Sequence, residues 1–189
     1  MTMTSRERVL AALNHREPDR VPIDFGAMRS TGIMAVEYNR LKKHLHRTEG
    51  QTFVYDLFQQ LAEPEGWILD LFHADVVQLH RLRPAFGFSI TERRDGELPD
   101  GSPCTYPADF QPVSYRDGEA IMEGDRLFAY RPKAGLVFYQ EFHPFKGIRS
   151  ADGIDPAYLP SMADDEFAYL STQSRQLRQS TDRAILGAF

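Results

Sequence analysis

Polar side chains that could bind a small molecule stand in or next to short apolar runs of this sequence. Asp24 lies within the run Val21–Phe25, and Arg29 follows that run in a stretch bounded by two glycines. His80 directly follows a later apolar run, and Asp56 lies between the two runs. A carboxylate accepts hydrogen bonds, a guanidinium pairs with carboxylates, and an imidazole binds ligands in either protonation state. These four residues are therefore the candidate ligand contacts.

Each candidate also has a structural interpretation that the sequence leaves open. Asp24 could be a hydrogen-bonded residue of its strand, and Arg29 could lie on the surface or cap a helix. His80 could be a structural hydrogen-bonding residue at a strand end, and Asp56 could cap the helix that follows it. Which interpretation holds for each residue depends on the helices and strands that position it.

The first of these elements is an amphipathic helix. Thr4 and Glu7 have the spacing of a capping box, in which each side chain accepts a hydrogen bond from a free N–H at the helix start. Pro18 ends the helix, and Val21–Phe25 is the expected first strand. The residues expected to face the core are Val9, Leu10 and Leu13, and those expected off that face are Arg6 and Arg8.

Periodicity predicts the remaining helices and strands. Helices are expected over residues 32–46 and 65–72, and strands over residues 52–54 and 74–79. A long last helix follows a capping box formed by Ser161 and Asp164 and ends before the apolar strand that begins at Ala184. The residues expected on its buried face are Phe167, Leu170, Ser174 and Leu177.

Residues 81–147 differ from the rest because glycine, proline and aspartate separate short aromatic runs. We interpret this part as a β-rich insertion whose aromatic side chains form a small core, with stacking surfaces for a small molecule as the alternative. The expected strands are Phe86–Phe88, Val113–Tyr115, Leu127–Tyr130 and Leu136–Tyr139.

The stretch Asn14–Pro22, with the sequence NHREPDRVP, resembles the start of the uroporphyrinogen decarboxylase superfamily. That superfamily includes the decarboxylase of haem synthesis and the corrinoid-linked methyltransferases. A weaker resemblance, at Tyr55–Ala62, is to the methyltransferase-like branch. The resemblance implies an α/β fold, the N-terminal portion of a (β/α)8 TIM-type barrel. On this interpretation residues 1–80 form the first barrel units, residues 81–147 an insertion on the barrel rim, and residues 148–189 a helix and the next barrel strand.

The resemblance also implies a function. The decarboxylase carries an arginine loop after its first strand, and Arg29 matches its first arginine, but the second arginine has no counterpart. The essential aspartate expected after the second strand is also missing, and His80 stands there instead. We therefore favour the methyltransferase-like branch, which transfers a methyl group between a corrinoid and a thiol, with porphyrinogen decarboxylation as the alternative.

The cofactors and substrates follow from the same resemblance. The zinc ligands of the methyltransferases lie in the C-terminal half of the family's domain. No cofactor is therefore expected within this chain, and zinc and a corrinoid belong to the complete enzyme. The expected partner is a small molecule, either a tetrapyrrole or a methyl donor.

Length and strand pattern predict an incomplete barrel. The chain has 189 residues, whereas a barrel of this type has about 250. An apolar strand over Ala184–Phe189 would be an exposed sheet edge unless something covers it. We therefore expect a catalytically incomplete fragment, with a homodimer or a separately encoded C-terminal half as the covering partner. A non-catalytic chain that assembles through this edge is the alternative.

Composition excludes several other classes. The net charge of −5 gives no electrostatic basis for nucleic-acid binding, and no apolar run is long enough to span a membrane. Cys104 is the only cysteine, so an internal disulfide is excluded. The expected location is the cytoplasm, because the charged N-terminus does not resemble a signal peptide.

Overall fold

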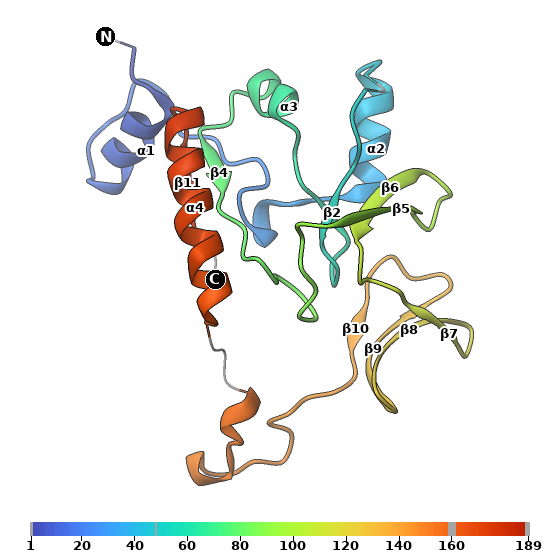
Figure 1. Cartoon of the computed structure of the whole chain (residues 1–189). Coiled ribbons are helices and arrows are strands. Elements are labelled where there is room, and N and C mark those ends of the chain that lie inside the picture. Colours follow the sequence, from blue (N-terminus) through green and yellow to red (C-terminus); the bar gives the residue numbers. More distant parts are fainter. Residues whose placement is uncertain (1, 48, 159–161, 188–189) are drawn as a thin grey trace.

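The structure, a computed structural model, describes residues 2–47, 49–158 and 162–187. Its helices are α1 (Ser5–Leu13), α2 (Ala35–His44), α3 (Gly66–Leu71) and α4 (Asp164–Ser180), and its strands form several small sheets (Figure 1). The described strands form no closed barrel. Every helix in the described parts is too short or too polar to cross a lipid bilayer.

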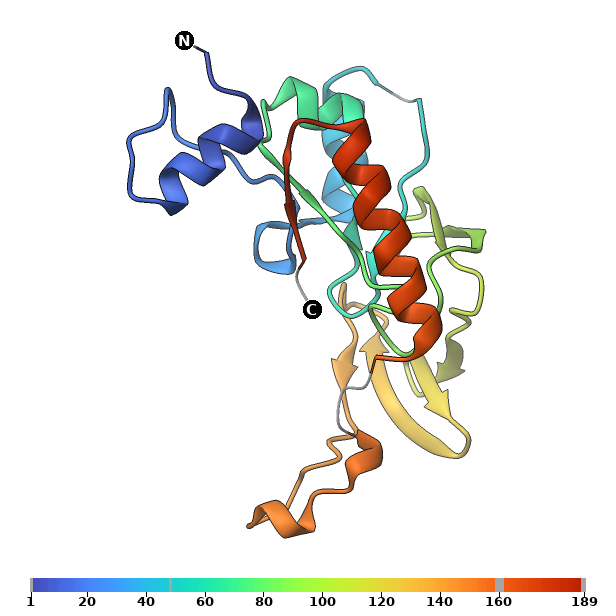
Figure 2. The same cartoon turned by 60° about the vertical axis from the view of Figure 1, so that its left-hand side comes forward.

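Two parallel strands form a separate small sheet in the described part of the chain. Strand β4 (Val76–Gln78) pairs in parallel with β11 (Ala184–Leu186), and α4 precedes β11 and packs against it (Figure 2). On the other side of β4, the Asp75 N–H donates to the carbonyl of Ile23 at 2.7 Å. The predicted strand over residues 21–25 is wrong, because this segment forms no strand ladder. Its second residue is a proline, which has no N–H to donate.

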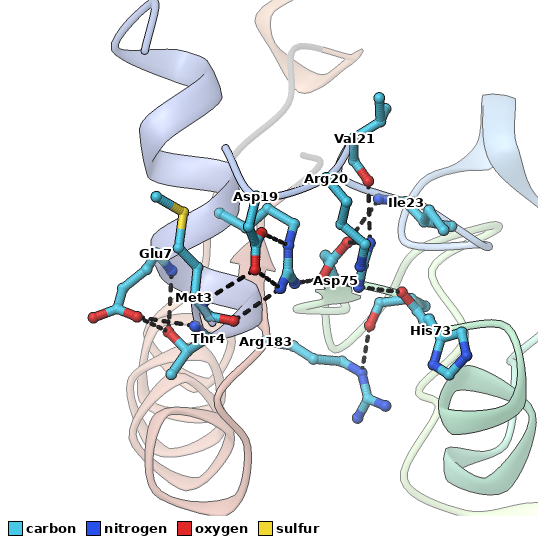
Figure 3. Close-up of polar contacts among 12 residues, drawn as sticks. Met3, Thr4, Glu7, Asp19, Arg20, Val21, Ile23, His73, Asp75 and Arg183 are labelled. Carbon is cyan, nitrogen blue, oxygen red and sulfur yellow. Dashed lines mark hydrogen bonds and ion pairs between the residues drawn. The ribbon is translucent and has the colours of Figure 1, made fainter. Parts of the chain in front are cut away.

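A buried ion-pair network fixes α1 against β4 (Figure 3). Asp75, with 0% exposure, accepts hydrogen bonds from Arg8 at 2.5 Å and from Arg20 at 2.6 and 2.9 Å. Arg8 also donates to Asp19 at 2.6 Å. Burial opposes ionisation of Asp75, but hydrogen bonds from Arg20, the Ile23 N–H and Arg8 hold its pKa below the usual range. Asp19 and Arg20, which lie in the stretch Asn14–Pro22, therefore help to hold α1 against β4.

The prediction for the buried face of α1 is wrong. Arg8 is buried, whereas Leu10 is 49% and Leu13 70% exposed. Arg8 faces inward because it pairs with Asp75, which is distant in the sequence. The capping box at the start of the helix is confirmed, because Thr4 and Glu7 bond each other's backbone N–H groups.

The second helix is shorter than predicted. Strand β1 (Ile33–Met34) takes the first residues of the expected helix, and α2 begins at Ala35. Lys42 is buried, and its Nζ lies 2.7 Å from a Glu65 carboxylate oxygen. A charge can be buried here because it is paired.

A three-stranded sheet lies next to this helix. Strands β2 (Val54–Asp56) and β3 (Leu61–Ala62) pair with each other, and β3 also pairs with β1, all antiparallel. The expected strand at residues 52–54 is thus shifted toward Asp56. Asp56 is placed at the end of a fully buried strand.

The insertion consists of a hairpin and a four-stranded sheet. The hairpin pairs β5 (Arg93–Glu97) with β6 (Pro103–Pro107), and the sheet has the order β10-β9-β8-β7. The strands of the sheet are β7 (Val113–Tyr115), β8 (Gly118–Glu123), β9 (Arg126–Pro132) and β10 (Tyr139–Gln140). The expected strand Leu136–Tyr139 is wrong except at Tyr139, which begins β10.

The expected strand at residues 86–88 is also wrong, because this segment is a loop. Its phenylalanines pack into the core: the Phe86 ring lies 4.1 Å from that of Phe58, and Phe88 contacts Phe110. Tyr139, by contrast, is exposed. The aromatic side chains at residues 86 and 88 thus serve as core.

The predicted buried face of α4 is partly wrong. Phe167 is 65% exposed, whereas Leu170 and Glu166 are buried. Glu166 accepts hydrogen bonds from the Arg81 side chain at 3.1 Å and from the Leu82 N–H at 2.9 Å. The helix thus docks on the residues after β4 through a carboxylate. The predicted cap residue Ser161 lies outside the described residues.

Candidate functional site

The loop after residues 21–25 is held in shape by Asp24. Its carboxylate accepts hydrogen bonds from the Ala27 N–H at 2.8 Å and from the Thr31 hydroxyl at 2.9 Å. Both partners belong to the loop that carries Arg29. Asp24 thus positions that loop, and both of its carboxylate oxygens are engaged.

Arg29 lies over the end of β2. Its Nε is 2.5 Å from Oδ2 of Asp56, and its guanidinium donates to the carbonyl of Pro84 at 2.9 Å. The Arg29 side chain is half-exposed, whereas Asp56 is buried and also accepts from the Gln59 N–H at 2.8 Å. The structure therefore brings two predicted site residues together, and Asp56 also caps the turn that follows it.

His80 forms a second cluster just beyond β4. Its Nε2 lies 3.4 Å from a Glu63 carboxylate oxygen, and the other Glu63 oxygen lies 3.3 Å from Arg93. Burial raises the pKa of Glu63, but His80 and Arg93 outweigh it, so the pKa stands below its ordinary value. Nδ1 of His80 is buried and has no hydrogen-bond partner in the described chain.

Tyr55 links the two clusters. Its ring meets the His80 ring edge-on at 4.6 Å, and its sequence neighbour Asp56 belongs to the first cluster. Burial raises the pKa of the Tyr55 hydroxyl, the charge of Asp56 adds to the rise, and Arg29 opposes it. Its hydroxyl is buried and has no partner among the described residues. His80 and the Arg29–Asp56 pair therefore lie near one buried tyrosine, whereas the contacts of Asp24 are with its own loop.

Two cavities open beside the cluster of His80 and Glu63. One, of about 150 Å³, reaches toward Phe25, and the other, of about 450 Å³, reaches toward Arg93. Both are lined by Glu63, Gln78, His80 and Leu177. The Gln78 side-chain oxygen is also buried without a partner within the described parts of the chain. Buried polar atoms are normally hydrogen-bonded, so Gln78 and His80 each hold an unpartnered atom within the described parts of the chain, behind the cavity walls that their residues line.

Sequence reasoning missed Glu63, Gln78 and Arg93. Gln78 had a detectable signal, because it is a polar residue in an otherwise apolar strand. Glu63 and Arg93 had none, since Glu63 follows β3 and Arg93 begins β5, and the two meet only in the folded chain.

The described residues offer no metal centre. No three of their His, Cys, Asp or Glu side chains are arranged to hold a metal ion. His80 has one carboxylate beside it, fewer ligands than a zinc ion takes from a protein. No step through a metal is therefore assigned to this chain.

Comparison with known proteins gives no relative. No family model, no curated protein and no solved structure matches this chain.

Proposed function

We propose that residues 1–189 form the first strands of a (β/α)8 barrel of the uroporphyrinogen decarboxylase and corrinoid methyltransferase type. The proposal is supported by the segments that lie side by side. Ile23 accepts a hydrogen bond from Asp75, the residue before β4, and β4 pairs in parallel with β11. In such a barrel each strand lies beside the next one along the chain. Among the described residues β11 has only β4 as a strand neighbour, so further strands would pair with its other edge.

On this proposal the cluster around Tyr55 is part of the barrel mouth and binds a small molecule. The single observation that carries the binding site is the pair of cavities lined by the polar side chains of Glu63, Gln78 and His80. Gln78 ends β4 and His80 follows it, and ligand sites of such barrels lie at the carboxyl ends of the strands.

Within this family we favour methyl transfer between a corrinoid and a thiol. Arg29 is engaged by Asp56 and by the Pro84 carbonyl, which leaves it fewer donors for a substrate carboxylate. Zinc, when bound in the complete enzyme, would lower the pKa of the acceptor thiol. This chain would contribute ligand contacts and one side of the barrel mouth. Decarboxylation of a porphyrinogen is the alternative, with Arg29 and Arg93 holding substrate carboxylates.

Titration of the purified chain with methylcobalamin and with uroporphyrin tests this proposal. We expect methylcobalamin to bind more tightly, and Gln78→Leu to weaken its binding at least fivefold. Gln176→Leu, which changes an exposed glutamine of α4, serves as the matched control and should change nothing. Binding of neither compound would refute the proposal.

Turnover assays separate the two branches. We expect no methyl transfer and no decarboxylation by the chain alone, because it supplies only part of the barrel. Decarboxylation of uroporphyrinogen by the isolated chain would refute the methyltransferase assignment and establish the alternative.

A second candidate function is non-catalytic assembly, with a second copy or a separately encoded half as the partner. It is favoured by the one-sided pairing of β11 and by the exposed apolar side chains of Leu13 and Val21. Light scattering and calorimetry test it. A defined dimer with one cooperative unfolding transition supports assembly, and a stable monomer refutes it.

We also propose a cytoplasmic location, since the one cysteine is a buried free thiol.

A further inference from the structure

The four-stranded sheet of the insertion holds a cavity that the proposed function does not use. Strands β7, β8 and β9 lie side by side (Figure 1), and the cavity, of about 600 Å³, lies at their turns. Gly118 pairs with Pro132 across β8 and β9, and the Lys133 N–H donates to the Asp117 carbonyl at 3.0 Å. The turn before β8 and the turn after β9 are therefore fixed next to each other. A concave site of this volume is large enough for a small molecule.

A row of polar side chains crosses three strands and forms one wall of this cavity. Ser114 of β7 is opposite Glu119 of β8, which is opposite Arg131 of β9, so the three side chains lie on one face of the sheet. Arg131 is held in place, because it pairs with Glu119 and lies over the Phe138 ring at 4.9 Å. The Glu119 side chain is 43% exposed, so its carboxylate can accept a further hydrogen bond from a ligand.

Two cations without a carboxylate partner stand at the turns. Arg116 and Lys133 line the cavity and are exposed, and neither forms an ion pair with another described residue. The carboxylate of Asp117, which also lines the cavity, accepts a hydrogen bond from the Tyr130 hydroxyl. An arginine and a lysine at one opening provide charged donors that match the oxygens of a phosphate group.

The backbone of Arg116 gives an independent reason to assign it a binding role. Arg116 and Asp117 form a two-residue hairpin loop, because Tyr115 pairs with Gly118. The φ of Arg116 is 50°, a conformation that glycine normally supplies in such loops. Strained positions of this kind cluster at ligand-binding sites. The Arg116 guanidinium lies over the Tyr115 ring at 5.0 Å, a contact that leaves its N–H donors available.

From these observations we propose that the cavity binds a phosphorylated sugar or polyol. Arg116 and Lys133 hold the phosphate, whose charge of about −2 at neutral pH attracts them more strongly than a carboxylate would. Glu119 and Ser114 contact hydroxyl groups of the ligand, which donate to the carboxylate. The inference uses neither the cluster around Tyr55 nor the family assignment, so its test is independent of the proposed function.

Calorimetric titration with glucose 6-phosphate, glucose and inorganic phosphate tests this inference. We expect glucose 6-phosphate to bind about tenfold more tightly than either of the others, because only this probe engages both the cations and the hydroxyl acceptors. Its affinity should fall as the salt concentration rises, since the two cations are exposed. Equal affinity for inorganic phosphate would rule out the sugar or polyol part of the ligand, and binding of neither phosphate compound would overturn the whole inference.

Variants assign the contacts to single side chains. Glycine takes the positive φ with less strain, so Arg116→Gly should keep the melting temperature while the affinity for glucose 6-phosphate falls about tenfold. Lys133→Gln should weaken binding by about fivefold, whereas Lys146→Gln, which changes an exposed lysine outside the cavity, is the matched control. Glu119→Gln should reduce the preference for glucose 6-phosphate over inorganic phosphate. Wild-type affinity in Arg116→Gly would contradict the assignment.

Discussion

The buried network around Asp75 gives the sharpest stability prediction. Asp75→Asn removes one charge but keeps the shape of the side chain. Wild-type Asp75 receives four hydrogen bonds, from Arg8, Arg20 and the Ile23 N–H. An asparagine would turn an N–H₂ group toward these donors, so part of the network would become repulsive.

The expected loss follows from the burial of each partner. Removing one member of a buried ion pair costs about 3–5 kcal/mol. Arg8 keeps Asp19 as a partner, and Arg20 is partly exposed, so we expect the lower limit, about 3 kcal/mol. At about 2–4 °C per kcal/mol for a chain of this size, the melting temperature should fall by about 6–12 °C.

Calorimetry and urea unfolding between pH 3 and pH 8 measure this loss. The pKa of folded Asp75 lies below its unfolded value, about 3.9, so its contribution is fully present above that value. The difference between wild type and variant should therefore be constant from about pH 5 to 8, and shrink as the pH falls below about 4. Asp125→Asn, in an exposed turn, should change stability by at most about 0.5 kcal/mol. A loss below about 1 kcal/mol in Asp75→Asn would refute the anchoring role.

Three further predictions concern the site and its surroundings. Arg29→Ala should destabilise more than Asp56→Asn in urea unfolding, by about 2 kcal/mol, because it leaves the buried Asp56 charge unpaired; equal losses would contradict the pairing. Gly26→Ala should lower the melting temperature more than Gly87→Ala does. Both glycines have positive φ, but only a Cβ at residue 26 would meet Pro64, at 2.6 Å, so equal shifts would show that the loop moves freely. Cys104 should react with a disulfide reagent at pH 8 at least tenfold more slowly than free cysteine, because burial raises its pKa to about 11, and urea should remove the difference.

Features that depend on near neighbours could be predicted from the sequence. The capping box at Thr4 and Glu7 needs only residues three apart, and β4 and β11 each contain consecutive apolar residues. The third helix, Gly66–Leu71, also lies within the predicted range of residues 65–72. In each case the hydrogen bonds or the burial pattern are set within a few residues of chain.

Features that depend on distant partners could not be predicted in this way. Arg8 is buried because Asp75 meets it, and Glu166 replaces Phe167 on the buried face because Arg81 and the Leu82 N–H bind it. The polar hairpin β5–β6 was missed because backbone pairing, and not an apolar pattern, makes it a strand pair.

The candidate site divides in the same way. The sequence alone predicts that Asp24, Arg29, Asp56 and His80 stand in or next to apolar runs, where a chain can present polar groups. The folded chain shows that Asp24 holds the loop, that Asp56 pairs with Arg29, and that His80 lies beside Glu63. These contacts cannot be predicted from the sequence, because a charge can be buried only beside its partner, and partners from separate elements become neighbours only when the chain folds.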